Sequence, residues 1–174
     1  YRNLTNYTVD NEIWMAYDSP IRVNCYRIVG NALSLVSSDV LSDNNSLVID
    51  FIRLDTGNVL VAWSRYTSTD LSVGFAYHNQ LGQWTILPHT SMFPGYAPYR
   101  GCGGTLCQHP DDNSIWLFYK ADGWNAVPAF HLTEIDNSIT LDWYKASLIP
   151  PTNNDIRPWS ESPPMIAASD YENN

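Results

Sequence analysis

Short apolar runs, each separated from the next by a polar turn, recur along the chain. Three of these runs directly follow an acidic turn and end at or near an aromatic residue. Turn-forming residues between two apolar runs are a strong local signal for a β-hairpin. The three segments are 8–17, 53–64 and 108–119, their acidic turns contain Asp10, Asp55, and Asp111 with Asp112, and their aromatic residues are Tyr17, Trp63 and Tyr119.

Each segment is followed by a polar loop and two further apolar runs, and another run precedes the acidic turn, most clearly at 47–52. The pattern predicts a repeating unit of strand A, acidic turn, strand B, loop, strand C, turn and strand D. No stretch has the spacing of a long amphipathic helix, so we predict an all-β fold. The runs that follow the three segments are 23–28 with 32–36, 72–77 with 83–87, and 126–132 with 139–144.

The period of this repeat indicates a β-propeller. Acidic turns recur at Asp10, Asp55, Asp112 and Asp170, a spacing that matches blades of roughly 40–50 residues once long loops are added. We therefore expect residues 1–174 to form a single incomplete propeller segment of four-stranded antiparallel blades. A β-sandwich made from the same strands is the alternative. The expected blades are 1–41, 47–88 and 104–148, and a fourth blade begins at 163–174.

Three blades and the start of a fourth cannot close a ring, because propellers typically have four to eight blades that cover one another's faces. The end sheets would expose apolar faces, which soluble proteins avoid. We therefore expect further propeller blades as partners, from the parent chain or from other copies of this chain. The tryptophans expected to pack in the core or between blades are Trp14, Trp63, Trp84, Trp116 and Trp143.

The hairpin from Leu54 to Arg65 has the sequence LDTGNVLVAWSR. It resembles the strand A/strand B hairpin of sialidases and other BNR-repeat propellers, in which a leucine, a turn with glycine, a small apolar run and an aromatic residue recur in every blade. Gly82, Gln83 and Trp84 are similar to the tail of a degenerate Asp-box, the Ser-x-Asp-x-Gly-x-x-Trp turn of that group, although no segment here has the motif intact. The resemblance implies a sialidase-like propeller fold and leaves the activity open, since one fold hosts many functions.

Composition and charge narrow the class of partner. Aromatic residues make up 13% of the chain and charged residues only 16%, a balance that suits β-sheets and sugar-binding surfaces better than helical bundles. The formal net charge of −9 argues against nucleic acid and anionic membranes, because both attract basic surfaces. No apolar run approaches the roughly 20 residues of a membrane helix, so we expect no membrane insertion.

Cysteine and histidine spacing argues against a metal site. The chain has neither a CxxC pair nor histidines at metal-ligand spacing, and we expect no metal and no cofactor. Cys102 and Cys107 could bridge across a short loop, which would leave Cys25 unpaired. Separate buried thiols are the favoured interpretation.

The loops predict a binding face. In a propeller the D-to-A and B-to-C loops emerge together around the central funnel, and two of the expected D-to-A segments, 88–104 and 149–163, are long. Loops hold charged residues because they are wet, yet five of the seven arginines fall in the expected D-to-A and B-to-C loops. These are Arg2, Arg22, Arg65, Arg100 and Arg157. Guanidinium groups bind carboxylates bidentately and aromatic rings stack on sugars, so we predict an anionic glycan as the ligand. The expected ligand-binding residues are Arg65, Arg100, Arg157, Trp124, Tyr99 and Trp159.

Three functions fit these features. The favoured hypothesis is a glycan-binding propeller segment of a larger extracellular protein, whether secreted, cell-surface or part of a virion. The alternatives are a fragment of a sialidase-like glycoside hydrolase or polysaccharide lyase, and a structural propeller scaffold in a viral tail or surface assembly. Enzymatic activity stays open and the catalytic residues unknown, because nothing separates the acids of the loop face from ordinary loop acids. These acids are Asp18, Asp70, Asp122 and Glu161.

Overall fold

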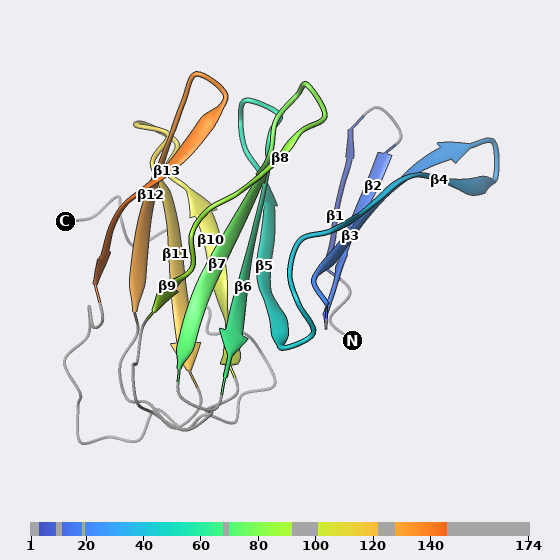
Figure 1. The fold of residues 1–174 in the computed structure, drawn as a ribbon. Coiled ribbons are helices and arrows are strands. Elements are labelled where there is room, and N and C mark those ends of the chain that lie inside the picture. The colour runs from blue at the N-terminus through green and yellow to red at the C-terminus, as the bar shows by residue number, and fades with distance from the viewer. Residues whose placement is uncertain are drawn as a thin grey trace. The chain divides into compact units, whose positions relative to one another are not determined.

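The computed structural model describes residues 4–9, 12–18, 20–67, 70–91, 101–121 and 128–145, with the side chains of 12–18, 20–67, 70–91, 104–119 and 128–143. Within these residues the protein is all-β, as its sequence predicts: the strands form three antiparallel sheets and no helix is present (Figure 1). The chain divides into two compact units, Tyr1–Pro98 with the first two sheets and Tyr99–Asn174 with the third.

Each sheet is a meander in which consecutive strands are neighbours, and this confirms the predicted order of four strands. Sheet 1 contains β1 (Leu4–Val9), β2 (Glu12–Tyr17), β3 (Arg22–Val29) and β4 (Ala32–Val40). Sheet 2 contains β5 (Ser46–Arg53), β6 (Val59–Tyr66), β7 (Leu71–His78), β8 (Trp84–Ile86) and the short β9 (Thr90–Ser91). Sheet 3 contains β10 (Gly101–Gln108), β11 (Ile115–Ala121), β12 (Ala129–Ile135) and β13 (Ser138–Lys145).

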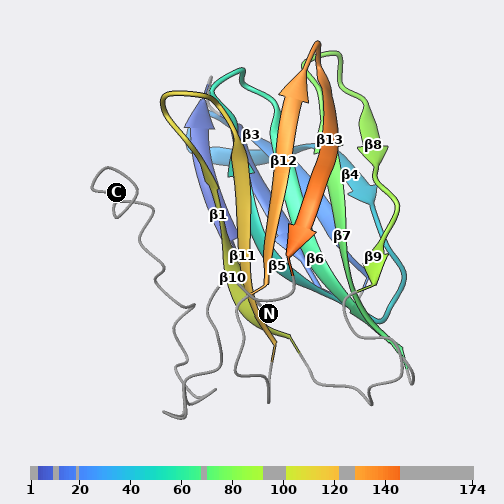
Figure 2. The ribbon, with the colours of Figure 1, turned by 90° about the vertical axis from the view of Figure 1, so that its left-hand side faces the viewer.

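The outer strand of sheet 2 is interrupted once. Both β8 and β9 pair antiparallel with β7 and follow one another along it (Figure 2). Pro88 lies between them and has no N–H to donate, which is why proline is confined to the edges of sheets. Leu87 still donates its N–H to the Phe75 carbonyl, 2.9 Å away. The two short strands therefore act as one outer strand, and sheet 2 keeps the order of the other sheets.

The central strands of sheet 2 are buried on both faces. The sequence of β6 is VLVAWSRY and that of β7 is LSVGFAYH, without the polar–apolar alternation of a sheet that has one face in water. Side chains from Val59 to Ser64 and from Leu71 to Tyr77 are all buried. The apolar sequence and the burial agree that β6 and β7 are covered on both faces.

Residues with positive φ close the hairpins at the turn end of the sheets. Gly57 (φ 86°) lies in the β5–β6 turn, where the Leu54 N–H donates to the Asn58 carbonyl at 2.8 Å. Asp136 and Asn137 (φ 51° and 59°) form a two-residue turn between β12 and β13, as in a type I′ hairpin. The predicted acidic turns that contain Asp55 and Asp112 are confirmed, and Asp10 lies outside the described residues.

Several element boundaries differ from the sequence expectation. β10 begins at Gly101 rather than 104, and β9 lies inside the segment 88–104, for which the sequence predicts a loop. Arg22 begins β3 and Arg65 lies within β6, although the sequence places both in loops. Antiparallel pairing explains the difference at Arg65, because this residue is held between Ser46 and Ser72 on the neighbouring strands. The predicted start of a fourth blade, 163–174, lies outside the described residues.

Sheets 1 and 2 pack together in the first unit. Ala16 and Val23 of sheet 1 share one buried apolar cluster with residues of sheet 2 that include Trp63. At the loop end, the Val48 N–H of β5 donates to Asp18 Oδ1 at 2.6 Å. The contact between the two sheets therefore has an apolar centre and a polar link at one end.

Candidate functional site

The loop end of sheet 2 carries polar side chains on four neighbouring strands. Ser46 on β5 lies opposite Arg65 on β6, Arg65 lies opposite Ser72 on β7, and Ser72 lies opposite Ser91 on β9. Residues directly opposite each other in an antiparallel sheet point to the same face. We call these four residues the polar row, since they lie on one face of sheet 2 and at its loop end.

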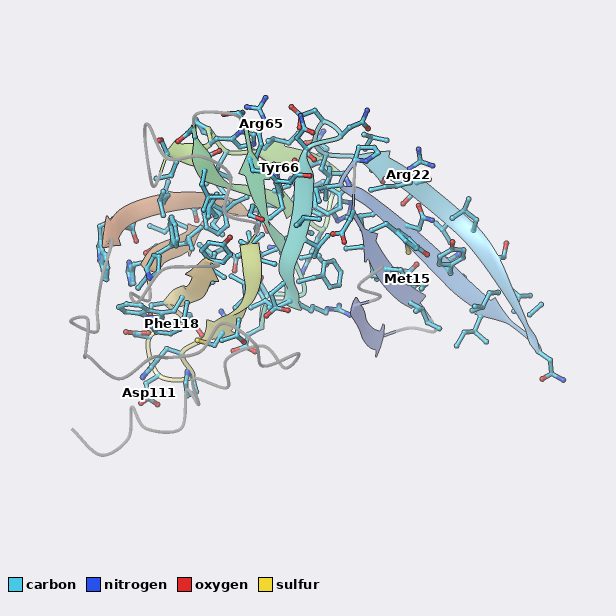
Figure 3. All side chains as sticks on the ribbon, turned by 90° about the horizontal axis from the view of Figure 1, so that it is seen from below. Met15, Arg22, Arg65, Tyr66, Asp111 and Phe118 are labelled. Carbon is cyan, nitrogen blue, oxygen red and sulfur yellow. The ribbon has the colours of Figure 1, made fainter. Side chains whose placement is uncertain are left out.

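Arg65 is oriented by Asp43 from the loop between β4 and β5. Its Nε and one Nη lie 2.9 and 2.7 Å from the same carboxylate oxygen, Asp43 Oδ2. The other oxygen, Oδ1, accepts hydrogen bonds from the Asn45 N–H and the Ser46 hydroxyl, both at 3.3 Å. Both partners are accessible, with 35% of the Arg65 side chain and 47% of the Asp43 side chain exposed. Figure 3 shows Arg65 on sheet 2. The guanidinium therefore reaches solvent in a defined orientation.

The Asp43 carboxyl is held in its charged form. Its pKa is lowered, chiefly because the Arg65 guanidinium donates a hydrogen bond to the carboxylate. Partial burial opposes this effect, while the N–H of Asn45 and the hydroxyl of Ser46 add to it. Asp43 is therefore ionised at neutral pH, and its charge balances that of Arg65.

A second carboxylate lies at the other side of the polar row. Asp70 Oδ1 accepts a hydrogen bond from the Ser91 hydroxyl at 2.6 Å. Asp70 belongs to the β6–β7 turn, where the Thr67 N–H donates to the Asp70 carbonyl at 2.8 Å. The backbone of this turn therefore sets the position of the carboxylate.

His89 is favoured in its neutral form. The pKa of its imidazole is lowered, first by burial and then by the positive charge of Arg65. The ring meets the indole of Trp63 edge-on, with the two ring centroids 5.8 Å apart. A neutral imidazole both donates and accepts hydrogen bonds. One guanidinium, two carboxylates and one neutral imidazole form a site suited to hydroxyl groups.

Asp18, one of the acids that the sequence places at the loop face, has a structural role. Its Oδ1 accepts the hydrogen bond from Val48 that links the two sheets of the first unit. Asp70 is likewise bonded, to the hydroxyl of Ser91. The other two acids, Asp122 and Glu161, lie outside the described residues.

Of the predicted ligand residues, Arg65 is the one that the structure describes. Sequence reasoning missed its partner Asp43, as well as His89 and Ser91. The run Asp43-Asn-Asn-Ser46 has the composition of a turn, but nothing local indicates that its carboxylate meets a residue of β6. The predicted ligand residues outside the described side chains are Arg100, Arg157, Trp124, Tyr99 and Trp159, and their convergence on Arg65 stays a prediction.

Metal ligands, cysteines and membrane-spanning helices are three further features of the described part. No three His, Cys, Asp or Glu side chains within it are grouped so that they could hold a metal ion. Cys25 is buried and unpaired, and burial raises the pKa of its thiol to about 12. The alternative to separate thiols, a bridge between Cys102 and Cys107, involves the side chain of Cys102, which lies outside the described side chains. None of the described residues forms a helix long and apolar enough to cross a membrane.

Comparison with known proteins identifies no relative: no family model, no curated protein and no solved structure matches this chain. The strand order of the sheets and the side chains at the loop end therefore carry the functional argument.

Proposed function

We propose that this chain is a carbohydrate-binding segment of a β-propeller of the sialidase-like kind, and that sugar binds at the loop end of its sheets. The observation that carries the proposal is the polar row, with its exposed and oriented Arg65–Asp43 pair. Sugar hydroxyls donate and accept hydrogen bonds, and the side chains around the row offer both kinds of partner.

The strand arrangement supports a propeller over a β-sandwich. Propeller blades are four-stranded antiparallel sheets whose faces are covered by neighbouring blades. All three sheets have the same meander order, and β6 and β7 of sheet 2 are buried on both faces. In a two-layer sandwich each sheet keeps one face in water, and its strands alternate accordingly. The continuous apolar sequence of β6 and β7 does not fit that alternation.

The site geometry supports a ligand with several hydroxyl groups. A guanidinium has five N–H donors, and Asp43 engages Nε and one Nη of Arg65. Asp43 and Asp70 supply carboxylate acceptors, and His89 supplies a neutral nitrogen pair. An exposed ion pair contributes only about 0–1 kcal/mol to stability, so a ligand can share the Arg65–Asp43 pair at little cost to the fold.

The described part of the site supports a neutral sugar better than an anionic one. Two carboxylates, those of Asp43 and Asp70, flank the single guanidinium of Arg65. The chain as a whole has a formal net charge of −9, which repels anions at long range. The anionic glycan predicted from the sequence would need Arg100 and Arg157 at the same end.

Titration calorimetry with a panel of neutral oligosaccharides and their uronate counterparts tests this proposal. We expect the wild-type chain to bind a neutral member of the panel. Arg65→Ala should weaken that binding by roughly 10- to 100-fold, since a hydrogen bond from a charged group is worth about 1.5–3 kcal/mol. Binding that prefers uronates and weakens with salt would identify the ligand as anionic instead.

Arg27→Ala is the matched control. Arg27 also forms an exposed ion pair, with Glu12 at 2.8 Å, but it lies at the turn end of sheet 1, away from the polar row. Its replacement should leave sugar affinity unchanged. The proposal fails if the wild-type chain binds no member of the panel, or if the two arginine variants lose affinity equally.

A further inference from the structure

The second strands of the three sheets correspond residue by residue. Arg53 lies opposite Val59 at the β5–β6 turn, and Gln108 lies opposite Ile115 at the β10–β11 turn, so Val59 and Ile115 correspond. β2 is aligned with them at Tyr17, the aromatic residue that occupies the place of Trp63 and Tyr119 in the sequence repeat. The corresponding sets are Ile13, Val59 and Ile115; Trp14, Leu60 and Trp116; Ala16, Ala62 and Phe118; and Tyr17, Trp63 and Tyr119.

In the first unit, one sheet covers the next through these positions. Ala16 of sheet 1 shares a buried cluster with Val59 and Trp63 of sheet 2, and Trp14 packs against that cluster. The Trp14 ring lies 4.9 Å from the ring of His78. Trp14 and Ala16 thus lie on the face of sheet 1 that packs against sheet 2. Val59 and Trp63 lie on the face of sheet 2 that receives them.

Trp14 covers a pair of rings that belong to neighbouring strands. His78 on β7 lies directly opposite Trp84 on β8, with the two ring centroids 4.8 Å apart. The Trp14 ring is 6.4 Å from that of Trp84. The predicted packing role of Trp14, Trp63 and Trp84 is thus confirmed.

In sheet 1, Ile13 and Tyr17 correspond to Val59 and Trp63, which lie on the covered face of sheet 2. This face of sheet 1 is only half-buried. Leu33, Leu35 and Val40 of β4 extend this face, and they are 56%, 55% and 55% exposed. Figure 3 shows Met15 and Arg22, which belong to it, on sheet 1. We call this surface face P; its apolar members include Ile13, Met15, Tyr17, Ile28, Leu33, Leu35 and Val40.

Sheet 3 has a face of the covering kind, like the face of sheet 1 that packs on sheet 2. Trp116 and Phe118 occupy the positions of Trp14 and Ala16, the positions that cover a following sheet. Trp116 lies opposite His131, which lies opposite Trp143, so these side chains share one face. We call the surface of Trp116, Phe118, His131 and Trp143 face F.

The rings of face F form a continuous cluster that reaches solvent. The Trp116 and Trp143 centroids are 5.2 Å apart, and His131 stacks on Trp143 at 5.4 Å with an interplanar angle of 5°. Trp143 is 39% exposed, so the aromatic cluster presents part of its surface to solvent. Such a patch marks a surface for a partner.

We propose that a second copy of this chain docks head-to-tail, with face P of one copy packed against face F of the other. The contact would repeat the one between sheets 1 and 2, because face P corresponds to the covered face of sheet 2 and face F carries the residues in the covering positions. This proposal does not depend on carbohydrate binding.

A head-to-tail contact joins two different surfaces, so it closes only if the rotation between copies returns to the start. Closure into a ring rests on the proposed propeller arrangement, whereas the pairing of face P with face F does not.

Sedimentation equilibrium and light scattering on single-face variants test the pairing. Leu35→Lys alters face P and Trp143→Lys alters face F. Each should convert the wild-type assembly, which has twice the chain mass if the contact closes and a larger mass if it does not, to a species of the chain mass. Leu81→Lys is the matched control, because Leu81 is 79% exposed in the β7–β8 turn and belongs to neither face. Thr140→Lys, at an exposed position beside face F, replaces Trp143→Lys if circular dichroism shows that variant unfolded.

Mixing the two face variants gives the decisive result. The Leu35→Lys chain keeps face F intact and the Trp143→Lys chain keeps face P intact. A mixture of the two variants should therefore form a one-to-one pair through a single junction of face P with face F. A wild-type chain that stays monomeric at its highest soluble concentration overturns the proposal. So does a mixture that never pairs, or a Trp143→Lys chain that still dimerises while Leu35→Lys does not.

Discussion

Gly74 lies directly opposite Trp63 across β6 and β7, and the indole occupies the space in which a side chain at Gly74 would lie. A Cβ at Gly74 would be 2.5 Å from Cε2 of Trp63 and 2.6 Å from Cδ2 of His89. Glycine in a strand often marks such a close approach. The largest side chain in the core of the first unit thus depends on the absence of a side chain on the neighbouring strand.

Gly74→Ala should destabilise the protein by about 1–3 kcal/mol, because an added methyl group in a packed core forces its neighbours to move. Urea unfolding followed by tryptophan fluorescence measures the loss. Trp63→Phe in the same chain should recover part of it, since the smaller ring frees the space. Strictly additive effects of the two substitutions would contradict the proposed contact.

Asp43→Asn should lower stability at pH 7 by no more than about 1 kcal/mol, as is usual for an exposed ion pair. The pKa of Asp43 is lowered in the folded state, so its contribution is present above the unfolded-state pKa of about 4. It is lost as the pH falls through the lower folded-state pKa. Wild-type and variant unfolding curves should therefore converge in acid and in high salt. A difference that persists at about pH 2 would point to a cause other than the Arg65 pair.

Mild acidification should lower the stability of the first unit, because protonation of His78 is less favourable in the folded chain than in the unfolded chain. Burial beside Trp14 and Trp84 lowers the pKa of this imidazole, while the charges of Asp39 and Glu12 oppose the shift. Below about pH 6.5 the unfolded chain binds a proton that the folded chain does not, so stability decreases toward about pH 5. His89 contributes in the same direction. His78→Gln should flatten the dependence of unfolding free energy on pH, and an unchanged slope would rule out this role.

Cys25 should resist alkylation in the folded protein. Its thiol is 2% exposed, and burial raises its pKa to about 12, so little thiolate forms at pH 8. Peptide mapping after iodoacetamide treatment should find Cys25 unmodified in native buffer and modified in urea. Rapid native modification would show that β3 separates from sheet 2 more readily than the buried contact implies.

The amino-acid sequence by itself determines the strand pattern of this protein. Hairpin turns such as Leu54–Asn58 depend on local residues, because Gly57 alone tolerates the required positive φ and the flanking apolar runs set the strands. The repeat of these hairpins predicts four-stranded meanders, and the structure confirms them. The run Val59–Trp63 of β6 is apolar at every position, which agrees with its burial on both faces.

Only the tertiary structure decided the candidate site and the contact surfaces. Arg65 meets Asp43 from another loop, and Trp14 meets His78 from another sheet. Neither contact has a local signature, because each joins residues far apart in the chain whose positions depend on how whole strands pair and pack. The sequence predicts Arg65 in a loop, but strand pairing places it in β6, opposite Ser46 and Ser72 on the neighbouring strands. Local turn chemistry can specify a strand, but the partner of a side chain across the sheet is set by strand register and by the burial of the faces.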